Sequence, residues 1–237
     1  MNQMRIAART VVALLAASFS LASPQPAAQS LDQLSGRDAT AGLKAALDKG
    51  AAAALASLGR NDGFWANPKV RIPLPEHLQR ARTALKFMGK GDEVDALELA
   101  VNRAAEQAVP QAKTLLTNAV KSISVDDAKQ ILRGGDDSVT QFFKAKTASD
   151  LAERFLPIVR KVTDKSGLAQ QYNALAAQGA SFGLVKPEQA TVERYVTQKA
   201  LDGLYTMIAE EEKKIRANPV AAGSDIIRKV FGALNQR

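Results

Sequence analysis

Cysteine is absent from the 237-residue sequence, and histidine occurs once, as His77. The lack of cysteine excludes disulfides, thiolate nucleophiles and cysteine-ligated zinc or iron–sulfur centres. A single histidine excludes a histidine-rich metal site and most triads that need a histidine base. Aromatic residues make up only 5% of the chain, too few for the basic, aromatic-lined surface typical of nucleic-acid binding. We therefore predict no metal, no cofactor and no nucleic-acid partner.

Long hydrophobic runs are also missing. The most apolar stretch, Val11 to Leu21, follows Arg5 and Arg9 and is about 11 residues long, whereas a membrane span needs about 20. This pattern predicts a cleavable signal peptide over residues 1–22, with cleavage after Ala22, and a periplasmic mature protein without a transmembrane segment. The alternative is an uncleaved N-terminal anchor.

The bulk composition is that of a globular protein, with 46% hydrophobic and 24% charged residues. Removal of residues 1–22 takes away two arginines and no acid, so the net charge falls from +8 to +6. This surplus favours contact with an anionic component of the cell envelope. Because composition does not shift along the chain, we predict a linker over residues 23–33 and a single domain over 34–237.

Helical periods punctuated by glycine and proline run through the whole domain, without an alternating strand pattern. The pattern predicts an all-α, irregular globule of about nine or ten helices, the longest over residues 191–217. Capping boxes are expected at Ser124 with Asp127 and at Thr147 with Asp150. Residues 60–75 contain an Asn-Asp-Gly turn and an Ile-Pro-Leu-Pro segment, which predict one long extended loop.

Several sequence words occur together in the order typical of one bacterial exported family. The chain resembles the domain of unknown function 4197 family over roughly residues 34–234. The resemblance implies a helical fold and export, and it brings no activity, ligand or catalytic residue. The words that carry it are Asp62–Phe64, Val70–Pro75, Asn102–Glu106, Asp127–Lys129 with Ile131–Leu132, Tyr195–Leu204, Glu210–Arg216 and Lys229–Gly232.

An acidic run lies on the longest predicted helix. At 100° per residue, Glu211 and Glu212 flank the apolar stripe that contains Ile208. Carboxylates at the edge of a core need partners, and Arg216 and Arg103 are the natural ones. A buried glutamate beside a second one could act as a general acid/base in a hydrolase.

The other interpretation of this run is a structural network of i, i+4 ion pairs, Glu210 with Lys214 and Glu212 with Arg216. A similar choice applies to Arg103, which can pair with Glu106 at i, i+3. It serves either as a core ion pair or as an anion site.

The loop offers a recognition surface. Phe64 and Trp65 are adjacent, so one is expected in the core and the other exposed. Trp65, with Lys69 and Arg71 nearby, could recognise an extended peptide, a glycan or a lipid head group. The alternative is a loop that simply lies across helix ends, held by its aromatic side chains.

These patterns favour a non-enzymatic periplasmic binding or scaffold protein that presents the Trp65 loop and a basic surface to an envelope partner. The alternative is a hydrolase of an envelope polymer that uses Glu211 or Glu212.

Overall fold

The computed structural model describes residues 34–135, 137–167, 169–174 and 191–234. The expected signal peptide and linker lie outside these residues. Within them every regular element is helical, which confirms the all-α prediction. The elements are α1 (Gly36–Leu58), α2 (Glu76–Phe87), α3 (Gly91–Ala108), α4 (Ala112–Lys121), α5 (Val125–Arg133), α6 (Ser138–Thr163), α8 (Val192–Ala217) and α9 (Asp225–Leu234), with 3-10 helices η2 (Val109–Gln111) and η4 (Pro219–Ala222).

The eight α-helices with defined bounds in the described part of the chain are fewer than the nine or ten expected. The expected break at Thr147 is wrong, because α6 runs through it as one helix. The Thr147 hydroxyl is buried and does not cap a helix N-terminus. It donates a hydrogen bond to the carbonyl of Phe143 (2.7 Å) and forms another with the hydroxyl of Tyr205 on α8 (2.9 Å). The threonine therefore satisfies its hydroxyl between two packed helices rather than at a helix start.

Two other helix starts agree with the predictions. At α5, the Ser124 hydroxyl accepts from the Asp127 amide (3.1 Å), and the Asp127 carboxylate accepts from the Ser124 amide (2.9 Å). These reciprocal bonds form the expected capping box. At α8, the Thr191 hydroxyl accepts from the Arg194 amide at 3.2 Å. Local side-chain chemistry sets both starts.

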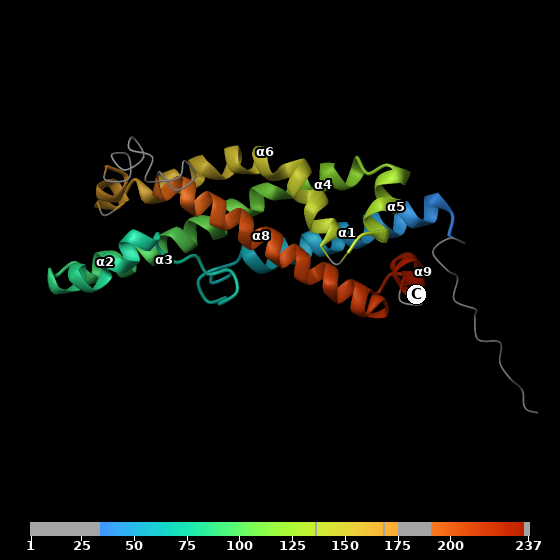
Figure 1. Cartoon of the computed structure of the whole chain (residues 1–237), viewed down its shortest axis with the longest axis horizontal. Helices are drawn as coiled ribbons and strands as arrows, with labels where there is room; N and C mark the ends of the chain where they lie inside the picture. The colour runs from blue at the N-terminus through green and yellow to red at the C-terminus, as the bar shows by residue number, and fades with distance from the viewer. Residues whose placement is uncertain (1–33, 136, 168, 175–190, 235–237) are drawn as a thin grey trace, which may run out of the picture.

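Helix α8 lies in the middle of the molecule and packs along both α6 and α1, while α9 packs on α1 (Figure 1). The side chains between these helices form one continuous apolar core. Its largest fully buried members include Phe64, Phe143, Phe155, Phe231, Leu43 and Leu97. Burial of each such side chain contributes about 1.5–3 kcal/mol, so the helices hold together without disulfides or metals.

The segment between α1 and α2, residues 59–75, is free of helix, but most of it forms turns and bends rather than one long extended loop. Residues 59–66 and 68–70 form turns and bends, and 71–75 run without regular structure into α2. Phe64 anchors the turns: it is fully buried against α8, where Gly203 leaves it room. A Cβ at Gly203 would lie 2.6 Å from the Phe64 ring. The loop is therefore a compact structure packed on α8.

Helices α2 and α3 form a hairpin at one end of the long axis of the molecule (Figure 1). Leu78 is the only buried residue of α2. Helix α2 packs mainly on α3. The turn between them therefore extends from the body with little covering it.

Candidate functional site

Glu212 and Arg216 form the most deeply buried ion pair among the described residues. Their side chains are 3% and 14% exposed. The Glu212 Oε1 atom accepts from Arg216 Nε at 3.0 Å and lies 2.9 Å from Arg216 Nη2. This pair is the predicted i, i+4 partnership on α8, and it places the glutamate in the core rather than at a cleft.

Arg216 also ties α8 to two other helices. Its Nη2 donates to the Ser138 hydroxyl at the start of α6 (3.0 Å) and to the Ile131 carbonyl on α5 (3.4 Å). The guanidinium thus links three helices, with the Glu212 carboxylate as its counter-charge. An arginine fork suits such a multidentate position better than lysine would.

The Glu212 carboxylate lies close to the N-terminus of α6. Burial raises its pKa above the ordinary value of 4.5, while the hydrogen bond from Arg216, its charge, and the backbone N–H groups of Val139 and Thr140 act in the opposite direction. Asp137, the residue before α6, makes no side-chain cap. Glu212 therefore supplies, from α8, the negative charge that a helix N-terminus favours.

The space beside Glu212 is very small. The cavity there has a volume of about 10 Å³ and is lined mainly by apolar side chains, among them Phe143, Ile208 and Phe231. Such a volume holds about one water molecule and no substrate. The Glu212 Oε2 atom, buried and without a hydrogen-bond partner in the described residues, is the group that a water there would satisfy.

The neighbouring acids pair differently from the prediction. Glu211 is half-buried and pairs with Lys214 at 2.7 Å. Glu210, expected to take that lysine, instead accepts from Lys69 of the loop at 2.6 Å. The predicted Glu210–Lys214 pair is therefore wrong, because a cation from a distant segment reaches Glu210 and Lys214 turns to the acid three residues before it.

Arg103 lies in a separate cluster, away from the two glutamates. It pairs with Glu106 as predicted (2.7 Å) and with Asp62 of the loop (2.7 Å). Hydrogen bonds to Glu106 and then Asp62 raise the pKa of Arg103. The other oxygen of Glu106 accepts from the backbone amides of Phe64 (3.0 Å) and Trp65 (3.2 Å). This cluster therefore holds the loop turns on α3.

Two further residues of α3 hold the last part of the loop, residues 71–75. Asn102, fully buried, accepts from the Ile72 amide and donates to the Ile72 carbonyl, both at 2.8 Å. Glu98 bridges Arg71 (3.1 Å) and Arg82 of α2. The role of Glu98 could not be predicted from the sequence, since its partners come from two other segments.

The loop residues proposed for recognition all have partners within the chain. Trp65 is half-buried, and the Arg71 guanidinium carbon lies 3.8 Å from its ring centroid. Phe64 is the core aromatic of the pair, which was expected to have one buried member. Arg71 and Lys69 pair with glutamates of α3 and α8. These contacts match the alternative interpretation, in which the loop lies across helices and is held by its side chains.

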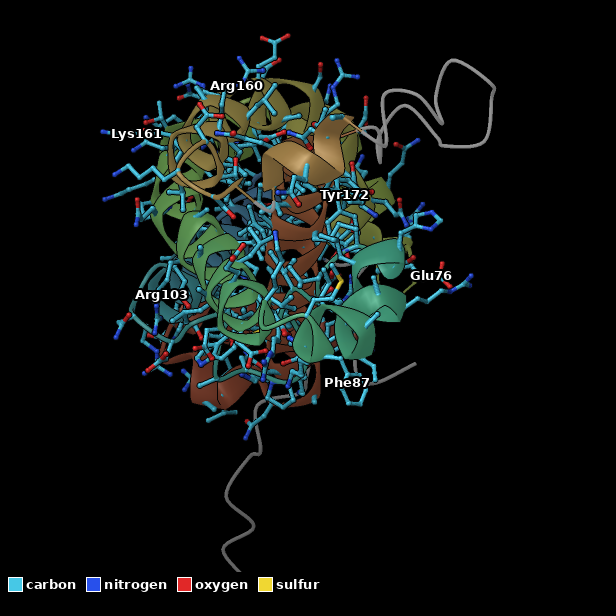
Figure 2. The ribbon with its side chains drawn as sticks, turned by 90° about the vertical axis from the view of Figure 1, so that its left-hand side faces the viewer. Glu76, Phe87, Arg103, Arg160, Lys161 and Tyr172 are labelled. Atoms are coloured by element: carbon cyan, nitrogen blue, oxygen red, sulfur yellow. The ribbon has the colours of Figure 1, made fainter. Side chains whose placement is uncertain are left out.

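The largest exposed apolar side chains lie instead at the α2–α3 turn. Phe87 is 89% exposed and Met88 is 70% exposed. Figure 2 shows the Phe87 ring at the edge of the molecule, pointing away from the helices. We call Phe87 and Met88 the apolar tip. Sequence reasoning missed it, although the signal was present: two large apolar residues directly precede a Gly-Lys-Gly turn.

Other site types receive no support from the described residues. Among them there is no group of three or more histidine, aspartate or glutamate side chains placed to hold a metal ion. None of their helices combines the length and hydropathy needed to cross a membrane. His77 is exposed in the first turn of α2.

A comparison with protein families matches residues 33–232 to the family described as "Protein of unknown function (DUF4197)". The chain belongs to this family. Comparisons with curated proteins and with solved structures found no match. Membership in the family covers nearly all of the predicted domain and brings no catalytic or ligand-binding residue with it. The function therefore has to be argued from the contacts of this chain.

Proposed function

We propose that this protein is a non-enzymatic binding or scaffold protein of the cell envelope, exported by the predicted signal peptide, and that it binds through the apolar tip. The observation that carries the proposal is the contrast between its charged and its apolar side chains. The charged candidates Arg103, Glu211 and Glu212 are engaged in ion pairs. Phe87 and Met88, in contrast, are largely exposed.

The hydrolase alternative has weaker support. A general acid/base must reach the proton that it transfers in a bound substrate. Glu212 is 5% exposed and adjoins a space of about 10 Å³. Glu211 is more open, but Lys214 lies 2.7 Å from its carboxylate. The space beside Glu212 is thus too small for a polymer chain, and the Glu211 carboxylate is held in an ion pair.

Binding through Trp65, which the sequence suggested, has weaker support than binding through the apolar tip. Arg71 covers one face of the Trp65 ring and is itself paired with Glu98. Release of the ring for a ligand would break both contacts. The tip needs no such rearrangement, because its side chains are already exposed.

Retention of the chain by an isolated envelope preparation, membranes and wall polymer together, tests the proposal. The double variant Phe87→Ser/Met88→Ser should be washed off more readily than the wild type. The matched control is Val220→Ser, which removes another exposed apolar side chain (65% exposed) from η4. Equal retention of the wild type and the double variant would contradict binding through the tip.

A further inference from the structure

Helix α2 has little apolar contact with the rest of the domain. Eight of its twelve residues are exposed, and Leu78 is its one buried residue. Figure 2 shows Glu76 and Phe87, at the two ends of α2, both at the edge of the molecule. An isolated helix of this length is only marginally stable in water. The helical state of α2 therefore depends on its contacts with α3, the helix on which it packs.

Ion pairs supply a large part of these contacts. Arg82 lies on the same face of α2 as Leu78 and the half-buried Leu85, four residues after the first and three before the second. Its Nη2 atom lies 3.1 Å from Asp95 Oδ1 and also donates to Glu98 Oε2. We call Arg82, Asp95 and Glu98 the latch, because they join the middle of α2 to α3.

The latch can open without leaving a buried carboxylate unpaired. Glu98, whose side chain is 11% exposed, keeps a second cation, since Arg71 Nη2 lies 3.1 Å from its other oxygen. The Arg82 side chain is already 36% exposed, and its buried Nε atom has no hydrogen-bond partner among the described residues. Transfer of the guanidinium into water would satisfy this atom. Separation of Glu212 from Arg216, in contrast, would leave a buried charge without its partner.

The backbone is anchored on both sides of α2, close to the helix. Before it, Leu74 is 1% exposed, and after it, Val94 is fully buried. Between α2 and α3, Gly89 has a φ of 75°, and nothing lies within 4 Å of where its Cβ would be. A glycine in such a place allows the chain to change direction without strain. Residues 76–93 are therefore free to move as a unit between two fixed points.

We infer that residues 76–93 form an arm that the latch holds on α3, and that this arm undocks from α3 while the other helices stay packed. Asp95 and Arg82 are accessible to solvent, so dissolved salt screens their attraction and favours the undocked arm. The arm carries the apolar tip, and its undocking moves the tip relative to the domain. The latch acts on α2 whether or not the tip has a partner.

Hydrogen exchange of the full-length chain, measured by mass spectrometry on peptides of α2 and α8, tests the undocking. The amides of α2 should exchange at least about 100-fold faster than those of the central helix α8, which open only when the whole domain unfolds. An increase from about 0.1 M to about 1 M NaCl should speed exchange several-fold in α2 and not in α8. Equal protection of the two helices would overturn the inference.

Two substitutions on the same helix test the latch itself. Arg82→Gln should speed exchange in α2 about tenfold and leave α8 unchanged. The matched control is Arg80→Gln, which also removes one positive charge from α2. Arg80 pairs with Glu76 of the same helix, and both side chains are more than 70% exposed, so the control should change exchange by less than about twofold. Equal effects of the two variants, or no effect of Arg82→Gln, would overturn the latch.

A single thiol reports the same motion independently, because the chain has no cysteine. Leu78→Cys places a thiol on the face of α2 that packs on α3, and a maleimide should label it each time the arm undocks. Addition of Arg82→Gln or of salt to this variant should speed the labelling. Val196→Cys, at a fully buried position of α8, should be labelled only on global unfolding.

Two labelling results would contradict the inference. Labelling at position 78 no faster than at position 196 would show that the arm stays docked until the whole domain unfolds. Fast labelling at position 78 that neither salt nor Arg82→Gln changes would show that the latch does not hold the arm. None of these measurements contains an envelope component, so their outcome is independent of retention through the apolar tip.

Discussion

Replacement of Glu212 by alanine tests the buried ion pair that joins α8 to α5 and α6. The substitution removes the counter-charge of Arg216, whose side chain is 14% exposed and cannot move freely into water. Loss of one partner from a buried pair costs about 3–5 kcal/mol, because the remaining charge stays desolvated. For a domain of this size, that loss lowers the melting temperature by about 10 °C.

The neighbouring residue provides the control. Glu211 is on the same helix, but its partner Lys214 has a side chain that is 65% exposed. Pairs of this kind contribute at most about 1 kcal/mol. The free energy of unfolding of Glu211→Ala should therefore be close to that of the wild type. Chemical denaturation followed by circular dichroism gives both free energies. If Glu212→Ala and Glu211→Ala differ by less than about 1 kcal/mol, the burial argument for Glu212 fails.

A double-mutant cycle separates the energy of the Glu212–Arg216 ion pair from the energy of packing the two side chains. Glu212→Leu combined with Arg216→Met replaces both charges by apolar side chains of similar size. The double variant should be more stable than either single one, since no buried charge remains without its partner. Strictly additive losses would show that the two side chains do not interact in the folded state.

The raised pKa of Glu212 also predicts a pH dependence. Because burial raises this pKa, the folded chain binds the proton more tightly than the unfolded chain does. The stability from this group is therefore fully present at low pH. It is lost as the pH rises from the ordinary value of 4.5 through the raised folded value. Glu212→Gln cannot ionise and should lack this fall, so parallel stability profiles for wild type and variant would contradict the assignment.

Three further predictions concern the loop and its supports. Gly203→Ala should destabilise the fold by about 1–3 kcal/mol in chemical denaturation, since the new Cβ would lie 2.6 Å from Phe64; a neutral effect would refute this close packing. Asn102→Ala should cost about 2–3 kcal/mol and speed hydrogen exchange at the Ile72 amide, which would lose its buried acceptor; unchanged exchange would argue against the contact. Burial raises the pKa of Tyr195 to about 12, so stability should fall as the pH rises from 10 towards that value, and Tyr195→Phe should reduce the fall.

Much of the fold follows from local chemistry and was predictable. The capping box at Ser124 and the start of α8 after Thr191 depend on residues within three positions of each other. The i, i+4 pair of Glu212 with Arg216 likewise depends only on the geometry of one helix. Thr147 misled the prediction because the same short-range signal occurs inside a helix, where packing against Tyr205 overrides it.

The candidate site was less predictable, because its residues meet across long stretches of sequence. Lys69 and Glu210 are 141 positions apart, and their pairing changed which acid Lys214 contacts. The sequence placed Glu212 at the edge of the core, but its burial and the small space beside it depend on how α1, α6 and α9 pack.

The sequence by itself determined the all-helical architecture, the lack of thiol chemistry, and the family to which the chain belongs. These properties depend on composition, on periodicity and on short-range order. Only the tertiary structure decided which side chains are covered by other parts of the chain and which are exposed to solvent. It showed Trp65 covered by Arg71, and Phe87 exposed on the outer face of α2. Exposure depends on what the rest of the chain packs against, and a helical period cannot show which face of a helix remains uncovered.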